Sequence, residues 1–194
     1  MSLGSLDRRA VVAELLKDRG DLLVVTGLGS PSYDVMAAGD HDHNYYLWAA
    51  MGSAATAGFG LAMAQRSRPV LVLTGDGEML MGLGALATIG QKLPPNLTIA
   101  VLDNGHYGET GMQQSHTGRG LELARVAAAC NFAHTAAITA AADVPALRER
   151  IHAKSGTTLA TIKISADELP RALPPRDGVF VKNRFRAALG FKTI

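Results

Sequence analysis

Three things are scarce in this sequence: cysteine, long hydrophobic runs and net charge. The chain has one cysteine in 194 residues, so an internal disulfide is excluded and a reducing compartment fits. Cys130 lies in an alanine-rich segment, and we expect it to be a buried small hydrophobe and not a nucleophile. No apolar stretch reaches the roughly 18 residues of a membrane span, and no signal-peptide region is recognisable, which predicts a cytoplasmic protein without membrane contact.

The weak charge excludes a further class of function. The formal net charge is +2, and no block of lysine and arginine or mixed basic and aromatic stripe occurs. This argues against nucleic acid as a main partner. Neither of the glycine-rich fingerprints of nucleotide-binding proteins follows a predicted strand, which weighs against a nucleotide-binding module.

What is present is an alternation of apolar strands and amphipathic helices. Continuous apolar runs are typical of parallel strands that are covered on both faces. The order predicts an α/β fold, a doubly wound and mostly parallel sheet with helices on both faces. The predicted helices span 6–17, 52–65, 79–90, 121–129 and 144–153, and the predicted strands span 22–26, 70–74, 97–102, 133–138 and 158–164.

The composition changes near residue 167. Prolines in 169–178 remove hydrogen-bond donors and break helices, and a helical pattern resumes over 182–189. We therefore predict one domain over 1–166 and a C-terminal extension over 167–194. That extension rests either on its own domain or on a partner chain.

Polar residues follow two of the predicted strands at the end where ligands bind in such sheets. Asp76 lies in Gly75-Asp76-Gly77, directly after the strand at 70–74, and Asn104 follows the strand at 97–102. Their side-chain oxygens suit a hard cation such as Mg²⁺, which usually also binds substrate phosphates. Either triplet alone is equally a turn. Together they predict a metal-bridged diphosphate site.

Turns that open helices offer unpaired N–H groups to an anion. Three such turns are candidates for phosphate binding: Gly77-Glu78, Gly52-Ser53 and Gly29-Ser30, the last of which is also read as a simple loop. For Glu78 we expect the backbone amide to be the useful group, because its carboxylate would repel phosphate.

Histidines supply candidates for proton transfer. His41-Asp42-His43 has no recognised metal-ligand spacing and is read as a polar loop, although His43 is a candidate proton donor at the cleft. Gln113 and His116, in the loop after Asn104, are candidate substrate-side residues.

These motifs resemble the diphosphate-binding (PP) domain of thiamine diphosphate (ThDP) enzymes. The family signature is Gly-Asp-Gly followed by a pair usually written Asn-Asn, and here the pair is Asp103-Asn104. Its first position departs from the pattern, but the second is the family's metal ligand. The resemblance implies that Mg²⁺ is bound by the side chains of Asp76 and Asn104 and by the backbone carbonyl of His106.

The resemblance also implies a cofactor site. Met51 stands where the family places a bulky residue beneath thiamine, although a lone methionine is ordinarily core filling, and Ala49 would offer its carbonyl to the aminopyrimidine. The expected cofactor-binding residues are Gly29, Ser30, Ala49, Met51, Gly52, Ser53, Gly75, Asp76, Gly77, Glu78, Asn104, His106, Tyr107 and Gly108.

Segments 105–114 and 181–185 are similar to the β subunits of sulfopyruvate decarboxylase and the C-terminal part of phosphonopyruvate decarboxylase. In the superfamily a glutamate on a separate pyrimidine-binding domain activates the cofactor. The resemblance thus implies a subunit that is inactive alone, pairs with a pyrimidine-domain α subunit, self-associates in a symmetric assembly and acts on a 2-oxo acid.

Alternatives stay open at this point. An acetolactate-synthase-like carboligase subunit would carry the same metal motif, and a non-catalytic ThDP- or nucleotide-binding module is a different class of function. An anionic 2-oxo acid would need basic groups near the cleft. The candidates are Arg119, Lys182 and Arg184, which surface solubility explains equally well.

Overall fold

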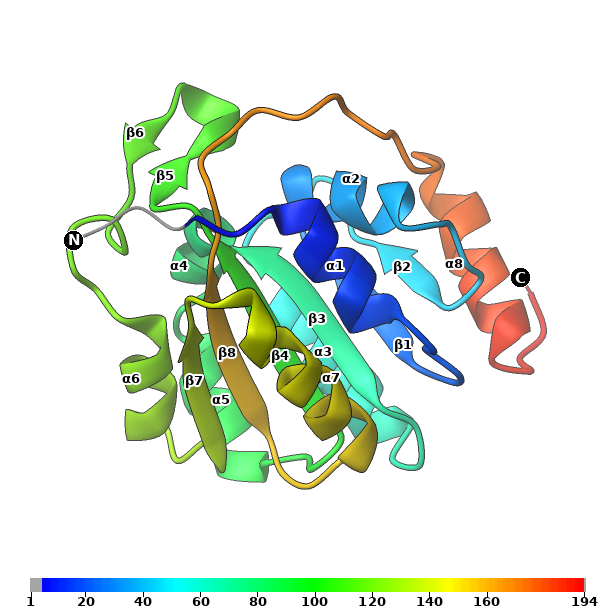
Figure 1. Ribbon diagram of the computed structural model, residues 1–194. Coiled ribbons are helices and arrows are strands. Elements are labelled where there is room, and N and C mark those ends of the chain that lie inside the picture. Colours follow the sequence, from blue (N-terminus) through cyan, green and yellow to red (C-terminus); the bar gives the residue numbers. More distant parts are fainter. Residues whose placement is uncertain (1–4, 194) are drawn as a thin grey trace.

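The computed structural model describes residues 5–193. The first four residues of the predicted domain 1–166 and the last residue of the predicted extension 167–194 lie outside the described residues. The centre of the fold is a six-stranded parallel sheet (Figure 1). The strand order is β2-β1-β3-β4-β8-β7. The strands are β1 Leu23–Thr26, β2 Asn44–Tyr46, β3 Val70–Gly75, β4 Leu97–Asp103, β7 His134–Ile138 and β8 Thr158–Lys163.

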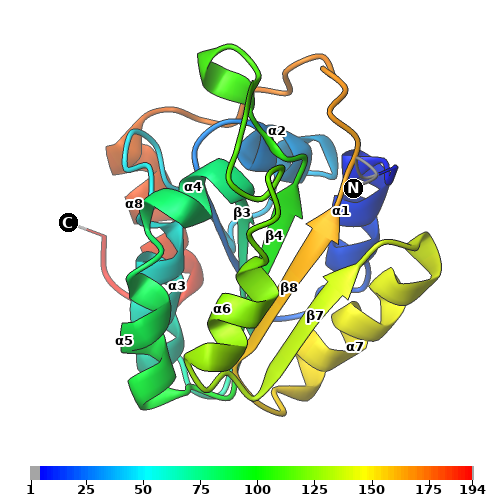
Figure 2. The ribbon, with the colours of Figure 1, turned by 90° about the vertical axis from the view of Figure 1, so that its left-hand side faces the viewer.

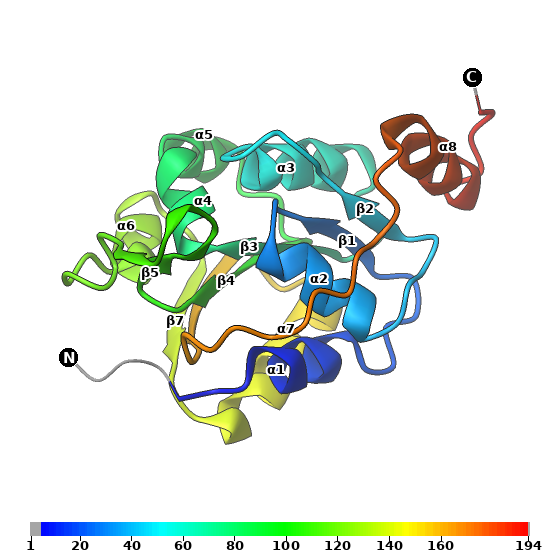
Figure 3. The same cartoon turned by 90° about the horizontal axis from the view of Figure 1, so that it is seen from above.

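Successive side chains along each strand serve two different cores. On β1, Val24 packs into one core while Leu23 and Val25 pack into the other, as the alternation of side chains along a strand requires. One core is covered by α1 Arg8–Leu16, α2 Ser30–Ala37 and α7 Val144–Ala153. The other is covered mainly by α3 Ala54–Ala64, α5 Ala85–Lys92 and α6 Leu123–Ala129 (Figures 2 and 3). The predicted doubly wound fold class is confirmed.

Helix α2 and the edge strand β2 are among the elements that were not predicted, as are the short strands β5 His106–Tyr107 and β6 Gln113–Gln114. Helix α2 begins after Gly29, whose φ of 82° suits glycine, and carries Pro31 in its first turn. Its short apolar pattern gives little periodic signal. Strand β2 has three residues and pairs on one side only, with β1. A run that short also leaves no clear pattern in the sequence.

The helix predicted over 79–90 is divided in two. Helix α4 Asp76–Met81 ends at Gly82, and α5 begins after Gly84. A Cβ built on Gly82 would lie 2.1 Å from the Gly52 carbonyl oxygen. The chain breaks where the turn that precedes α3 presses against it, and only glycine permits that approach.

The C-terminal extension lies against its own domain. Helix α8 Gly178–Ala188 begins four residues earlier than the sequence predicts, because the Asp177 side chain caps it by accepting from two backbone amides. Phe185 meets Tyr45 of β2 at 5.4 Å between ring centroids. Upstream, the Trp48 indole donates to the Pro175 carbonyl at 2.8 Å.

Arg184 is engaged on this extension and does not face a ligand cavity. Its guanidinium donates to the Asp40 carboxylate at 2.5 Å and stacks near Tyr46. Cys130, expected in the core, is only half-buried because it caps the end of α6. No helix among residues 5–193 combines the length and apolar character needed to span a membrane.

Two glycines of α3 test the packing of this helix on the sheet. A Cβ at Gly58 would lie 2.1 Å from Cγ2 of the buried Val72, whereas one at Gly60 meets open space. We expect Gly58→Ala to lower the free energy of unfolding by about 1–3 kcal/mol through overpacking. Gly60→Ala should raise it by about 0.5–1 kcal/mol. Urea unfolding measures both, and equal effects would contradict the packing.

Candidate functional site

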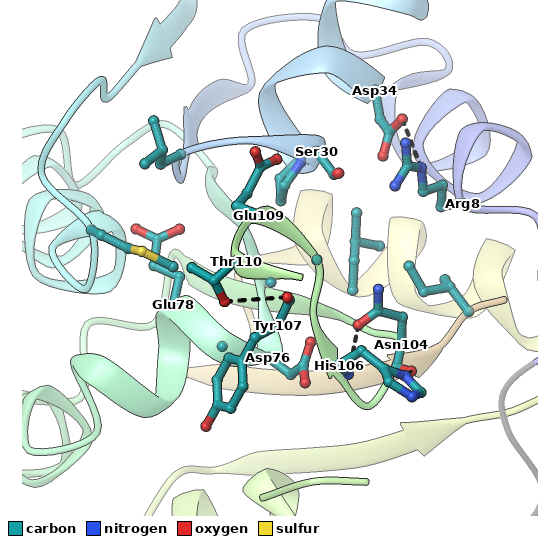
Figure 4. Close-up of a pocket in the computed structure, with 18 of the residues that line it drawn as sticks. Arg8, Ser30, Asp34, Asp76, Glu78, Asn104, His106, Tyr107, Glu109 and Thr110 are labelled. Atoms are coloured by element: carbon teal, nitrogen blue, oxygen red, sulfur yellow. Dashed lines mark hydrogen bonds and ion pairs between the residues drawn. The ribbon is translucent and has the colours of Figure 1, made fainter. Parts of the chain in front are cut away.

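A cavity of about 360 Å³ lies at the carboxyl edge of the sheet, where β1, β3 and β4 end (Figure 4). Asp76, Asn104, His106 and Tyr107 line one side of it, and Ser30, Asp34 and Arg8 line the other. The predicted residues that line it are Ser30, Met51, Gly75, Asp76, Gly77, Glu78, Asn104, His106, Tyr107 and Gly108.

The pairing of β3 with β4 brings the two motifs together. Gly75 lies opposite Leu102 in the parallel register, so Asp76 and Asn104 both follow the paired ends. The Asn104 side-chain oxygen accepts from the His106 amide at 2.9 Å, and the His106 ring contacts the Asn104 carbonyl at 2.8 Å. The loop after β4 is thereby fixed in a turn around the predicted metal ligand.

Asp76 is almost fully buried and held by two hydroxyl groups that sequence reasoning missed. Its Oδ2 accepts from Ser115 at 2.5 Å and from Thr117 at 2.9 Å. Burial raises the pKa of the Asp76 carboxyl, the Ser115 bond opposes that rise, and the negative charge of Asp103 adds to it. Ser115 and Thr117 lie beyond the motif in a polar loop, without a local signal for this role.

The close oxygen–oxygen contacts around Asp76 outnumber the hydroxyl protons that can form hydrogen bonds between them. Thr117 Oγ1 also lies 2.7 Å from Asp103 Oδ1 and 2.9 Å from Ser115 Oγ. Two hydroxyls therefore supply two protons to four close oxygen–oxygen contacts. A cation beside Asp76 would stabilise this crowd of acceptors. The residues present accordingly fit a divalent metal ion.

Glu78 is the second buried carboxylate of the cavity. Its Oε2 accepts from the Thr74 hydroxyl at 2.9 Å, and a Cβ at Gly27 would lie 1.4 Å from that oxygen. Burial raises the pKa of Glu78, while the Thr74 bond and the backbone amides of Gly52, Ala54 and Leu28 oppose the rise. The Glu78 side chain thus contacts the turns that were predicted to bind phosphate. The sequence did not indicate this contact.

Of the remaining residues predicted to bind the cofactor, only Met51 lines the cavity. Gly29 and Gly52 have positive φ values of 82° and 91°, as tight turns before helices require. Gly29 lies beside the Glu109 carboxylate, to which a Cβ would come within 2.6 Å. Ala49 has a φ of 58°, and it does not line the cavity, nor do Gly52 and Ser53. Met51 does, with 36% of its surface exposed.

His43 lies away from this cavity. It precedes Asn44, the first residue of β2, which pairs with Val24 in a parallel register. His43 is therefore at the amino edge of the sheet, opposite the edge that holds the cavity. Its neighbour is the His41 ring, 4.9 Å away between centroids. A role as cleft proton donor is not supported. His43 is near Met51 in sequence, but strand β2 runs between them and carries them to opposite edges of the sheet.

Gln113 lies in the hairpin formed by β5 His106–Tyr107 and β6 Gln113–Gln114, and His116 follows that hairpin; both side chains are exposed. The His116 Nδ1 is 2.7 Å from the Tyr107 hydroxyl, and Tyr107 lines the cavity. Gln113 donates to the Thr110 carbonyl at 3.0 Å. Neither candidate lines the cavity itself.

Arg8 and Asp34 form a further pair that the sequence did not reveal. The Arg8 Nε lies 3.3 Å from Asp34 Oδ1, and both side chains are buried at the cavity wall. Burial raises the pKa of Asp34 to about 6, against the opposing pull of Arg8 and Arg9. Arg8 and Asp34 come from different helices, so only packing joins them.

The fold and the strand-end cavity define a cofactor-binding domain of the α/β class. Residues 30–171 match the thiamine pyrophosphate enzyme family in its C-terminal TPP binding domain, and the chain belongs to this family. The resemblance inferred from the sequence is confirmed.

Two kinds of curated relatives share this domain. A phosphonopyruvate decarboxylase of Streptomyces viridochromogenes is 37% identical over 190 residues, which are 95% of this chain and 45% of the relative. The sulfopyruvate decarboxylase β subunit of Methanococcus maripaludis is 34% identical over 66% of this chain and 68% of that subunit. This chain thus spans less than half of the first relative.

A solved structure agrees with the fold. The benzoylformate decarboxylase of Polynucleobacter necessarius superposes with a TM-score of 0.70 at 21% identity, covering 85% of this chain and 34% of the other. At this identity the likeness concerns the fold.

The contact between Gly27 and Glu78 can be tested against a matched glycine. Gly27→Ala should lower the free energy of unfolding by about 1–3 kcal/mol, because its Cβ overlaps the Glu78 carboxylate. Gly75→Ala meets nothing within 4 Å and should change it by about 0.5 kcal/mol or less. Urea unfolding without ligand measures both, and an unaffected Gly27→Ala chain would rule out the buried position of Glu78.

Proposed function

We propose that this chain binds thiamine diphosphate together with Mg²⁺ at the carboxyl edge of its sheet. The observation that carries the proposal is the convergence of Asp76 and Asn104 on a cavity lined by helix-opening turns. Asp76 and Asn104 would hold the metal through their side chains, and His106 through its backbone carbonyl. Ser30, Gly77 and Glu78 would offer backbone amides to the diphosphate.

Charge supports a metal-bridged mode of binding. Four carboxylates line the cavity, and among the described lining residues Arg8 is the single guanidinium and is paired with Asp34. The carboxylates are Asp34, Asp76, Glu78 and Glu109. A diphosphate alone would meet net repulsion in such a cavity, whereas a divalent cation binds first to the oxygens and then attracts the phosphates.

The activity that best fits is decarboxylation of a small 2-oxo acid of the sulfopyruvate or phosphonopyruvate type. Bound thiamine diphosphate supplies the electron sink for this reaction. The residues of this chain bind and orient the cofactor, and Met51 supports it at the cavity wall. This substrate class is supported by the relatives, which are named as phosphonopyruvate and sulfopyruvate decarboxylases.

A partner subunit would complete the site. Met51 and Met81 line the cavity and are 36% and 64% exposed, so an apolar rim faces outward. The name of the β-subunit relative supports a separate α subunit that carries the pyrimidine domain. We propose a hetero-oligomer in the cytoplasm that is inactive without this subunit.

Cofactor binding is tested by thermal unfolding of the purified chain. Thiamine diphosphate with Mg²⁺, at about 100 times its Kd, should raise the Tm by about 5–10 °C, since saturation adds roughly 2.7 kcal/mol. Asp76→Ala should abolish the shift, and Asp21→Ala on the exposed surface should retain it. Stabilisation by ATP or NAD, with none by thiamine diphosphate, would refute the proposal.

The need for a partner is tested by reconstitution. The chain, a purified pyrimidine-domain α subunit, thiamine diphosphate and Mg²⁺ should together release CO₂ from sulfopyruvate or phosphonopyruvate, and either subunit alone should not. The complex built with Asp76→Ala should be inactive, because the metal ligand is lost. Release of CO₂ by this chain alone would show that the α subunit is dispensable. Carboligation products, in which a second 2-oxo acid accepts the carbon fragment that remains after loss of CO₂, would redirect the assignment to a synthase.

A further inference from the structure

Asp103 stands where the family motif has a neutral asparagine, and it is nearly as buried as a core residue, with 1% of its surface exposed. A lone carboxylate there would be costly, because burial of an unpaired charge is strongly unfavourable. It would also add a second negative charge close to Asp76. The structure shows how this charge is compensated.

Lys163 lies directly opposite Asp103. The two residues are register partners at the ends of the parallel strands β4 and β8. The Lys163 ammonium donates to Asp103 Oδ2 at 2.5 Å, and the Lys163 side chain remains 32% exposed. At this position an asparagine would present an amide N–H₂ or a neutral oxygen, and a facing lysine would have no charged partner.

The other oxygen of Asp103 connects the pair to the metal ligand. Oδ1 accepts from the Gly105 amide at 3.0 Å and from Thr117 Oγ1 at 2.7 Å. The same Thr117 hydroxyl lies 2.9 Å from Asp76 Oδ2. Thr117 has one proton for two carboxylates. The compensation of Asp103 therefore affects which carboxylate receives that proton.

We propose that Lys163 is a positioning residue for the metal ligand Asp76, and that the Asp103–Lys163 pair serves as a charged equivalent of the neutral asparagine in the family motif. With Asp103 paired, its demand for the Thr117 proton is reduced, and the hydroxyl is shared between Asp103 at 2.7 Å and Asp76 Oδ2 at 2.9 Å, which also accepts from Ser115. The second carboxylate oxygen is then left for the cation. The pair also keeps the net charge near the diphosphate at the value that a neutral amide would give.

This inference rests on the proposed function and makes a distinct prediction. Without Lys163, Asp103 draws the Thr117 proton and adds a negative charge near the diphosphate. Lys163→Met should weaken thiamine diphosphate binding at fixed Mg²⁺ by roughly 10- to 100-fold, the usual cost of losing a group that orients a metal ligand. Calorimetric titration of the full chain measures the Kd.

The decisive measurement is the double variant. Asp103→Asn with Lys163→Met replaces the charged pair by a neutral one and should restore the Kd to within about threefold of the wild-type value. Lys163→Arg keeps the positive charge and should also retain binding. Lys92→Met, on the exposed end of α5, is the matched control and should leave the Kd unchanged.

Each outcome separates the alternatives. If Lys163 only packs against its neighbours, the double variant will bind as weakly as Lys163→Met, and the inference is wrong. It is equally wrong if Lys163→Met binds like Lys92→Met. Should Lys163→Met fail to fold, the double variant and Lys163→Arg still decide, because neither leaves a buried charge unpaired. Absence of binding by the wild-type chain would instead overturn the proposed function itself.

Discussion

The parallel pairing of β3 with β4 is the constraint on which the site depends. The register places Gly75 opposite Leu102, so the chain leaves both strands at the same edge and at the same level. Both strands are buried in two cores and neither has freedom to slip, because a shift of one residue would exchange the residues facing each core. Asp76 and Asn104 are held together by packing that lies beneath the cavity.

Charge balance is the second organising feature of the edge. Buried acidic groups are each given a specific partner: Arg8 for Asp34, hydroxyls for Asp76, Thr74 for Glu78 and Lys163 for Asp103. These partners come from α1, from β3, from the loop after β6 and from β8. The arrangement keeps carboxylates in place at a position where they would otherwise repel one another, and leaves an electronegative cavity suited to a cation.

The cavity is also open on one side, where methionine side chains form its rim. Asp76 and Glu78 are buried and hydrogen-bonded in it, whereas its outer rim carries the exposed Met51 and Met81. Helix α8 of the C-terminal extension packs on β2 at the far edge of the sheet, whereas the segment before it passes beside the cavity, where Arg171 lies 3.9 Å from the Glu109 carboxylate.

Local sequence patterns were enough to predict the strands with continuous apolar runs, the fold class, the family and the position of Asp76 and Asn104 at strand ends. These follow from local patterns, because strand burial and turn chemistry are encoded within a few neighbouring residues. Three features required the folded structure: Ser115 and Thr117 donate to Asp76, Lys163 compensates Asp103, and His43 lies at the opposite edge of the sheet. Such contacts join residues far apart in the chain, and they depend on strand order and register, which no local pattern specifies.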